Sequence, residues 1–152
     1  MRILVVISII FFIASCNSKN GIVSVPIEDD FSHIANPKER WEAYQLSNYE
    51  IVQRRSCECI GLEYTARIVN NSVQKVAYEG EQSDEYTTFA KTNAITVDDA
   101  FDLIEEYSDE AYSITVDYHP RFGYPTKLII NIYEMIADEE IIYRMSDLKK
   151  FN

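Results

Sequence analysis

The 152-residue chain has few of the residues from which enzymes most often build an active site, with two histidines, three cysteines and four glycines. His33 and His119 lie far apart in the sequence, whereas a tetrahedral zinc site needs four nitrogen or sulfur ligands. The sequence contains no glycine-rich phosphate loop, HExxH helix or nucleophile elbow. We therefore predict no catalytic residues, no metal site and no cofactor, and favour a protein that is not an enzyme.

Basic residues are also scarce, since 14 lysines and arginines stand against 25 aspartates and glutamates, for a net charge of −11. Nucleic-acid affinity depends on clustered cations that contact phosphates, so we expect no nucleic-acid partner. The same charge keeps the protein soluble and away from anionic headgroups. A cationic partner would be attracted, although an ordinary solvated acidic surface is the simpler interpretation.

Only one long apolar run is present, from Ile3 to Ile13, and it is shorter than the roughly 20 residues that span a bilayer. Arg2 precedes this run and the small residues Ala14 and Ser15 follow it. This order predicts a signal peptide over residues 1–15 that is removed from the mature protein. A plain signal peptide would leave the chain without an anchor.

The sequence "IASC", residues 13–16, resembles the lipobox of bacterial lipoproteins, which implies lipidation of Cys16. More than one acyl chain on that residue gives stable membrane anchoring. We predict a lipidated N-terminus and tether over residues 16–35 and an extracytoplasmic domain in the bacterial cell envelope. By the same resemblance, Asn17 after the cysteine favours the outer membrane, facing the periplasm, where the cell has one.

The remainder, residues 36–152, fits a single α+β domain. Asn36 with Pro37 and Glu39 predicts a helix start, and Thr96 with Asp99 predicts a capping box for a second helix. Alternating segments predict strands beginning near Tyr49, a hairpin formed by 64–69 and 73–78, and further strands at 114–118, 128–132 and 140–145. We expect two helices packed on an antiparallel sheet of about six strands, in the order helix, three strands, helix, three strands.

The segment 79–94 is polar, acidic and aperiodic, and it predicts a long exposed loop of the kind that carries binding function. Its acidic and aromatic side chains are our candidate binding residues, namely Glu81, Asp84, Glu85, Tyr86 and Phe89. The alternative binding surface is a face of the sheet. The partner on either surface would be an unknown protein or small ligand.

Two motifs give the domain a family resemblance. "RSCEC" at residues 55–59 and "YHPRFGYPT" at residues 118–126 are similar to motifs of the bacterial lipoproteins known as domain of unknown function 6174. The resemblance runs from about Arg40 to Leu148. The family pattern favours an aromatic residue where this chain has Glu58 and an aspartate where it has His119. The resemblance implies a fold and an envelope location but no activity.

Cys57 and Cys59 lie one residue apart, so on a strand their Cα atoms would be about 6.5 to 7 Å apart, near the upper limit for a disulfide. Oxidation is the default outside the cytoplasm, and with Cys16 lipidated the count is even. A disulfide, reduced structural thiols, thiol–disulfide exchange and metal binding all stay open. Exchange has a physical basis, because Arg54 and Arg55 could stabilise a thiolate.

From these patterns we expect a lipid-anchored, non-enzymatic binding or interaction module. The alternative is a thiol–disulfide redox protein that acts through Cys57 and Cys59. A third, purely structural hypothesis is that the two cysteines only brace the end of a strand.

Overall fold

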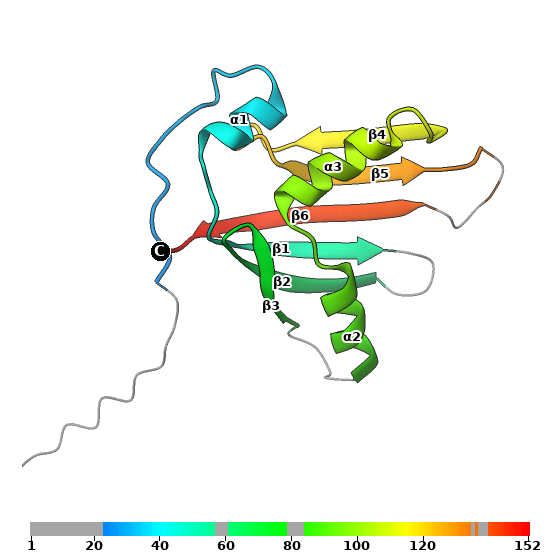
Figure 1. The fold of residues 1–152 in the computed structure, drawn as a ribbon, viewed down its shortest axis with the longest axis horizontal. Helices are drawn as coiled ribbons and strands as arrows, with labels where there is room; N and C mark the ends of the chain where they lie inside the picture. The colour runs from blue at the N-terminus through cyan, green and yellow to red at the C-terminus, as the bar shows by residue number, and fades with distance from the viewer. Residues whose placement is uncertain (1–22, 57–60, 79–83, 135, 137–139) are drawn as a thin grey trace, which may run out of the picture.

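The computed structural model describes residues 23–56, 61–78, 84–134, 136 and 140–152. It confirms the predicted α+β class, with a six-stranded antiparallel sheet in the order β3-β2-β1-β6-β5-β4 (Figure 1). The elements are α1 (Pro37–Ala43), β1 (Tyr49–Ser56), β2 (Gly61–Val69), β3 (Ser72–Ala77), α2 (Asp84–Asn93), α3 (Val97–Tyr107), β4 (Ser113–Tyr118), β5 (Pro125–Asn131) and β6 (Ile141–Lys150).

The sheet consists of two three-stranded meanders that meet where β1 pairs with β6. In the first meander, Asn70 and Asn71 form the β2–β3 turn with φ values of 49° and 56°. Two successive positive φ values are typical of a tight hairpin turn, and asparagine tolerates them well. The predicted hairpin is therefore confirmed at its turn as well as in its strands.

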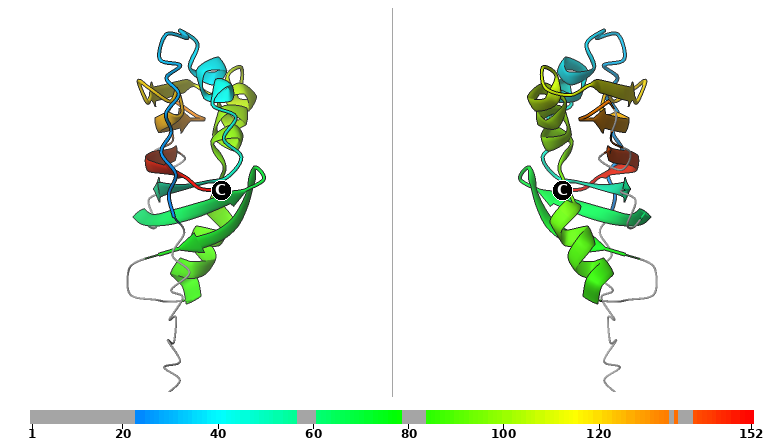
Figure 2. Two further views of the ribbon diagram at one scale, coloured as in Figure 1. Left: turned by 90° about the vertical axis from the view of Figure 1, so that its left-hand side faces the viewer. Right: turned by 90° about the vertical axis from the view of Figure 1, so that its right-hand side faces the viewer.

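The helices lie on one side of the sheet, and that side holds the core (Figure 2). Along β1, Tyr49, Ile51 and Gln53 are almost completely inaccessible, while the residues between them are not. Trp41 of α1 is buried and packs edge-on against Tyr49 at 5.4 Å. The apolar stripe of α3, in which Val97, Ala100 and Phe101 are buried, packs into the same core.

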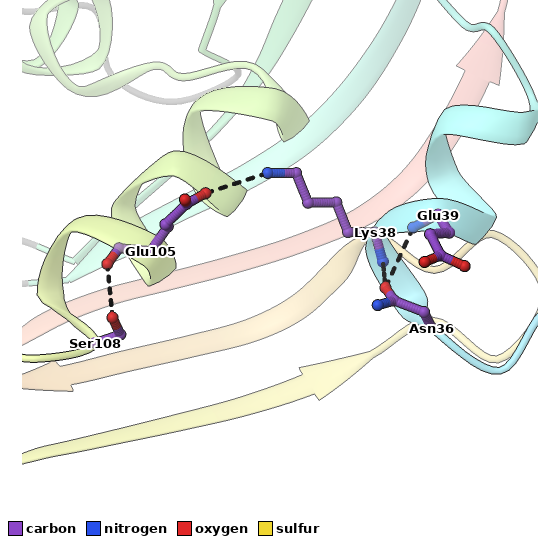
Figure 3. A network of polar contacts seen from close by, with 5 residues as sticks. All are labelled: Asn36, Lys38, Glu39, Glu105 and Ser108. Atoms are coloured by element: carbon purple, nitrogen blue, oxygen red, sulfur yellow. Dashed lines mark hydrogen bonds and ion pairs between the residues drawn. The ribbon is translucent and has the colours of Figure 1, made fainter.

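Both predicted helix starts form their caps. The Asn36 side chain accepts hydrogen bonds from the backbone N–H groups of Lys38 and Glu39 (Figure 3). Lys38 then reaches Glu105 on α3 at 3.3 Å, so an exposed ion pair links the two helices. At α3 the hydroxyl of Thr96 and the carboxylate of Asp99 complete the predicted capping box.

The predicted loop over 79–94 is wrong for residues Asp84–Asn93, which form helix α2, while residues 79–83 lie outside the described residues. Tyr86, Phe89 and Ala90 are spaced three and four residues apart, so they lie on one helix face. That face packs on Leu62 and Tyr64 of β2. This packing on the sheet stabilises the helix. Because the exposed positions of α2 are polar, only these three apolar residues indicate a helix in the sequence.

Residues 23–35, which belong to the segment predicted as a tether, lie against the domain. The backbone N–H of Val25 donates to the carbonyl of Lys150 at 2.8 Å. Phe31 packs edge-on against Tyr44, and Arg121 donates to the carbonyls of Ile27 and Asp29. The chain therefore enters the domain beside the end of β6.

Candidate functional site: the open face of the sheet

Alternating residues of the six strands point away from the helices, and we call the surface that they form the open face. On β1 these are Glu50, Val52, Arg54 and Ser56, which alternate with Tyr49, Ile51, Gln53 and Arg55 of the covered face. Since directly opposed residues of neighbouring strands point to the same side, the strand register identifies the rest of the face. The charged residues fall into two rows that run across the strands.

The central row crosses five strands. Its members, each directly opposite the next, are Glu63 on β2, Arg54 on β1, Arg144 on β6, Lys127 on β5 and Asp117 on β4. Arg144 therefore has a cation on each side. Among the described residues, none of the three cations forms an ion pair.

The second row lies nearer to the start of β1. It runs from Lys75 on β3 through Arg67 and Glu50 to Lys149 on β6. Here opposite charges do pair, because Nε and Nη2 of Arg67 both donate to one carboxylate oxygen of Glu50, at 2.8 and 2.7 Å. The same face thus contains one stabilising cross-strand ion pair and one run of cations that pair with no carboxylate of the described residues.

Charge is sorted between the two layers of the domain. The two rows together hold six cations and three carboxylates. Helices α1, α2 and α3 hold nine carboxylates and three cations. A chain with a net charge of −11 therefore presents a locally cationic surface on the side that the helices do not cover.

Neutral residues separate and flank the charged rows. Between them lie Thr65, Val52 and Ser146, and beyond the central row lie Ser56, Ile142, Ile129 and Thr115. Ile142 and Ile129 are directly opposite one another and only partly buried. The open face therefore offers an apolar pair next to its most concentrated positive charge.

Several of the predicted site residues lie outside the described residues, namely Cys16, Cys57, Cys59 and Glu81. Asp84 and Glu85 are exposed at the start of α2, whereas Tyr86 and Phe89 pack against the core. A hollow of about 510 Å³ between β3 and α2 is lined by other residues, Val73, Gln74, Lys75, Val76, Thr87 and Lys91. Of the four described candidates, two are exposed at the start of α2 and two pack against the core, so the role of the 79–94 segment in binding stays a prediction.

The two arginines before Cys57 point to opposite faces of the sheet. Arg55 lies on the covered face, with its guanidinium carbon 5.0 Å from the ring centre of Tyr143 and an Nη1 hydrogen bond to the carbonyl of Ser56. Arg54 lies on the open face over Gly61. The thiol–disulfide hypothesis stays a prediction, because the cysteines themselves are outside the described residues.

The buried hydroxyl groups hold the fold and are poor candidates for acid–base chemistry. Burial raises the pKa of Tyr49, Tyr64 and Tyr143, so all three stay protonated near neutral pH. Tyr64 and Tyr143 both donate to the carbonyl of Asn93 at the end of α2. Tyr64 and Tyr143 thus attach the end of α2 to the sheet.

His119 is likewise held in a structural role. Its Nδ1 accepts hydrogen bonds from the backbone N–H groups of Arg121 and Phe122, which requires the unprotonated nitrogen. Burial, together with the nearby charge of Arg121, lowers the pKa of the imidazole. The ring stacks on Tyr124 at 4.9 Å, so His119 organises the turn before β5.

Two further observations concern the described part of the chain. None of its helices has both the length and the apolar character needed to cross a membrane. It also contains no group of three or more His, Cys, Asp or Glu side chains that could hold a metal ion.

The fold and the open face define a small two-layer α+β domain with its helices on one side of an antiparallel sheet. More specifically, the chain belongs to the family of unknown function DUF6174, whose model matches residues 33–150. No curated protein and no solved structure is significantly similar to the chain.

Proposed function

We propose that the protein is a lipid-anchored binding module of the bacterial cell envelope, and that it holds its partner on the open face of the sheet. The observation that carries this proposal is the separation of charge between the layers, with a cationic open face on an acidic protein. Electrostatic complementarity gives a binding surface its specificity and its rate of encounter. The described residues supply no competing catalytic arrangement.

The anchor rests on the lipobox-like sequence at residues 13–16. Val23, the first described residue, is seven positions after Cys16, and an extended chain spans at most about 3.6 Å per position. A lipid on Cys16 would therefore hold the start of the domain within about 25 Å of the membrane.

We expect protein purified from cell membranes to begin at Cys16 and to carry the mass of its acyl chains. Intact-mass measurement of the mature protein tests this, and Cys16→Ser should shift the protein from the membrane fraction to the soluble fraction. Ser15→Thr is less suitable as a control because it alters the cleavage site, so Ser18→Ala serves instead. An N-terminus other than Cys16, or an unmodified Cys16, would contradict the anchor.

Site-specific photocrosslinking in intact cells tests the binding surface. Benzoylphenylalanine at Ser146, exposed beside the central row, should give a discrete crosslinked partner. The same group at Glu106, exposed on α3, is the matched control and should give at least about fivefold less of that product, since specific interfaces involve one defined patch. Equal crosslinking from both positions, or none from Ser146, would contradict a partner on the open face.

A further inference from the structure

The central row has an arrangement of charge that sheets ordinarily avoid. Like charges directly opposite one another on neighbouring strands destabilise a sheet. Arg144 nevertheless lies directly between Arg54 and Lys127. The chain has only 14 basic residues, and three of them occupy adjacent positions of one row.

The position of the Arg54 side chain agrees with this repulsion. A Cβ atom added to Gly61 on β2 would lie 3.2 Å from Nη2 of Arg54, so the guanidinium lies over that glycine. Gly61 is on the opposite side of β1 from Arg144. The Arg54 guanidinium has therefore turned away from the neighbouring arginine, and Gly61 provides the space.

Glu63 and Asp117 bracket the three cations, which gives the row the charge order minus, plus, plus, plus, minus. Strands are spaced about 4.8 Å apart, so the three cations span about 10 Å and the whole row about 19 Å. An extended anionic surface, such as a membrane or a nucleic acid, would continue past the cations and meet the carboxylates. A compact acidic cluster would not.

From this pattern, and on the basis of the proposed function, we infer that the open face docks a protein partner through a compact cluster of carboxylates on that partner. Two or three carboxylates within about 10 Å match the three cations, and basic residues beside them match Glu63 and Asp117. Arginine binds a carboxylate through two parallel hydrogen bonds, which favours this chemistry for Arg54 and Arg144. Ile142 and Ile129 add apolar surface that docking would bury.

The test uses the full-length chain in neutral detergent and a short synthetic peptide in which consecutive glutamates are flanked by lysines. The peptide with glutamine in place of glutamate is its control. We expect fluorescence anisotropy to detect binding of the glutamate peptide only, weakening with added salt. Arg144→Gln should weaken that binding at least about tenfold, because it removes the central cation. Arg67→Gln removes a cation of the same face that is already paired with Glu50, and it should change binding by no more than about twofold.

A stability measurement distinguishes the proposed binding role of Arg144 from a structural role. Since Arg144 repels its neighbours, Arg144→Gln should leave the urea midpoint unchanged or raise it while it weakens binding of the glutamate peptide. Failure of the glutamate peptide to bind, equal binding of the glutamine peptide, or unchanged affinity in Arg144→Gln would overturn the inference. So would tighter binding to phosphatidylglycerol vesicles or to an oligonucleotide, or self-association of the chain through this face.

The two proposals fail in different ways. If crosslinking from Ser146 persists in Arg144→Gln, a partner does occupy the open face but the central row does not recognise it. The proposed function then stands and the inference about acidic clusters is wrong. If Ser146 gives no product although the glutamate peptide binds, the row recognises carboxylates but the open face has no partner in the cell.

Discussion

Gly123→Ala should strongly destabilise the domain, and far more than the same change at the other described glycine, Gly61. Gly123 has a φ of +83°, and a Cβ atom there would lie 2.2 Å from the carbonyl oxygen of Pro37 and 3.1 Å from Cβ of Arg40. The first atom is backbone at the start of α1, so relief requires the helix to move. We expect the free energy of unfolding to fall by about 3 to 5 kcal/mol, from backbone strain together with the lost packing of α1.

Two contacts between α1 and the turn before β5 explain the size of the effect. Arg40 of α1 donates to the carbonyl of Pro120 in the turn, and Trp41 packs edge-on against Tyr124 at 6.3 Å. Both contacts need α1 at its present distance from the turn. A shift of the helix loses them together with the contact between Trp41 and Tyr49.

Urea unfolding followed by fluorescence measures this loss of stability directly, because Trp41 is the single tryptophan and lies where α1 meets the turn. Gly61→Ala is the matched control. Its new methyl group would meet the flexible end of Arg54 at 3.2 Å, and its φ is not in the left-handed region, so the change should be within about 1 kcal/mol. Equal effects of the two substitutions would show that the close approach of Gly123 to α1 does not limit stability.

Local sequence signals predicted most of the fold because its determinants are local. The caps at Asn36 and Thr96 involve residues two or three positions away, and the turn at Asn70 and Asn71 depends on those two residues alone. Strand alternation likewise predicted β1, in which every second residue from Tyr49 to Gln53 is buried. Helix α2 was missed because its apolar face has only Tyr86, Phe89 and Ala90, and packing on β2 decides its structure.

The open face could not be predicted in the same way. Arg54 and Arg144 are ninety positions apart in the sequence and become neighbours only because β1 pairs with β6. Within each strand, the cation alternates with buried residues and resembles an ordinary solvent-facing side chain. Overall composition pointed instead to an acidic surface, because a net charge does not reveal how the charges are divided between two layers.

Gln53→Met should produce the second large loss of stability. Gln53 is completely buried in the centre of the sheet. Its side-chain amide makes two hydrogen bonds to Ile95, a residue of the linker between α2 and α3. The side-chain oxygen accepts from the N–H of Ile95 at 3.1 Å, and the side-chain nitrogen donates to the carbonyl of Ile95. One side chain thus satisfies both backbone groups of Ile95 and fixes the linker to β1.

Methionine keeps the approximate volume of Gln53 but supplies no donor and only a weak acceptor. An unsatisfied buried polar group costs about 1 to 3 kcal/mol, so losing both bonds to Ile95 should lower the free energy of unfolding by about 2 to 5 kcal/mol. Gln74→Met, exposed on β3, should change it by less than about 0.5 kcal/mol. Urea unfolding compares the two variants, and amide hydrogen exchange should show faster exchange at Ile95 in Gln53→Met alone. If Gln53→Met kept both its stability and the protection of the Ile95 amide from exchange, another polar group or solvent would have to satisfy the backbone of Ile95. The amide of Gln53 would then not be what holds the α2–α3 linker to the sheet.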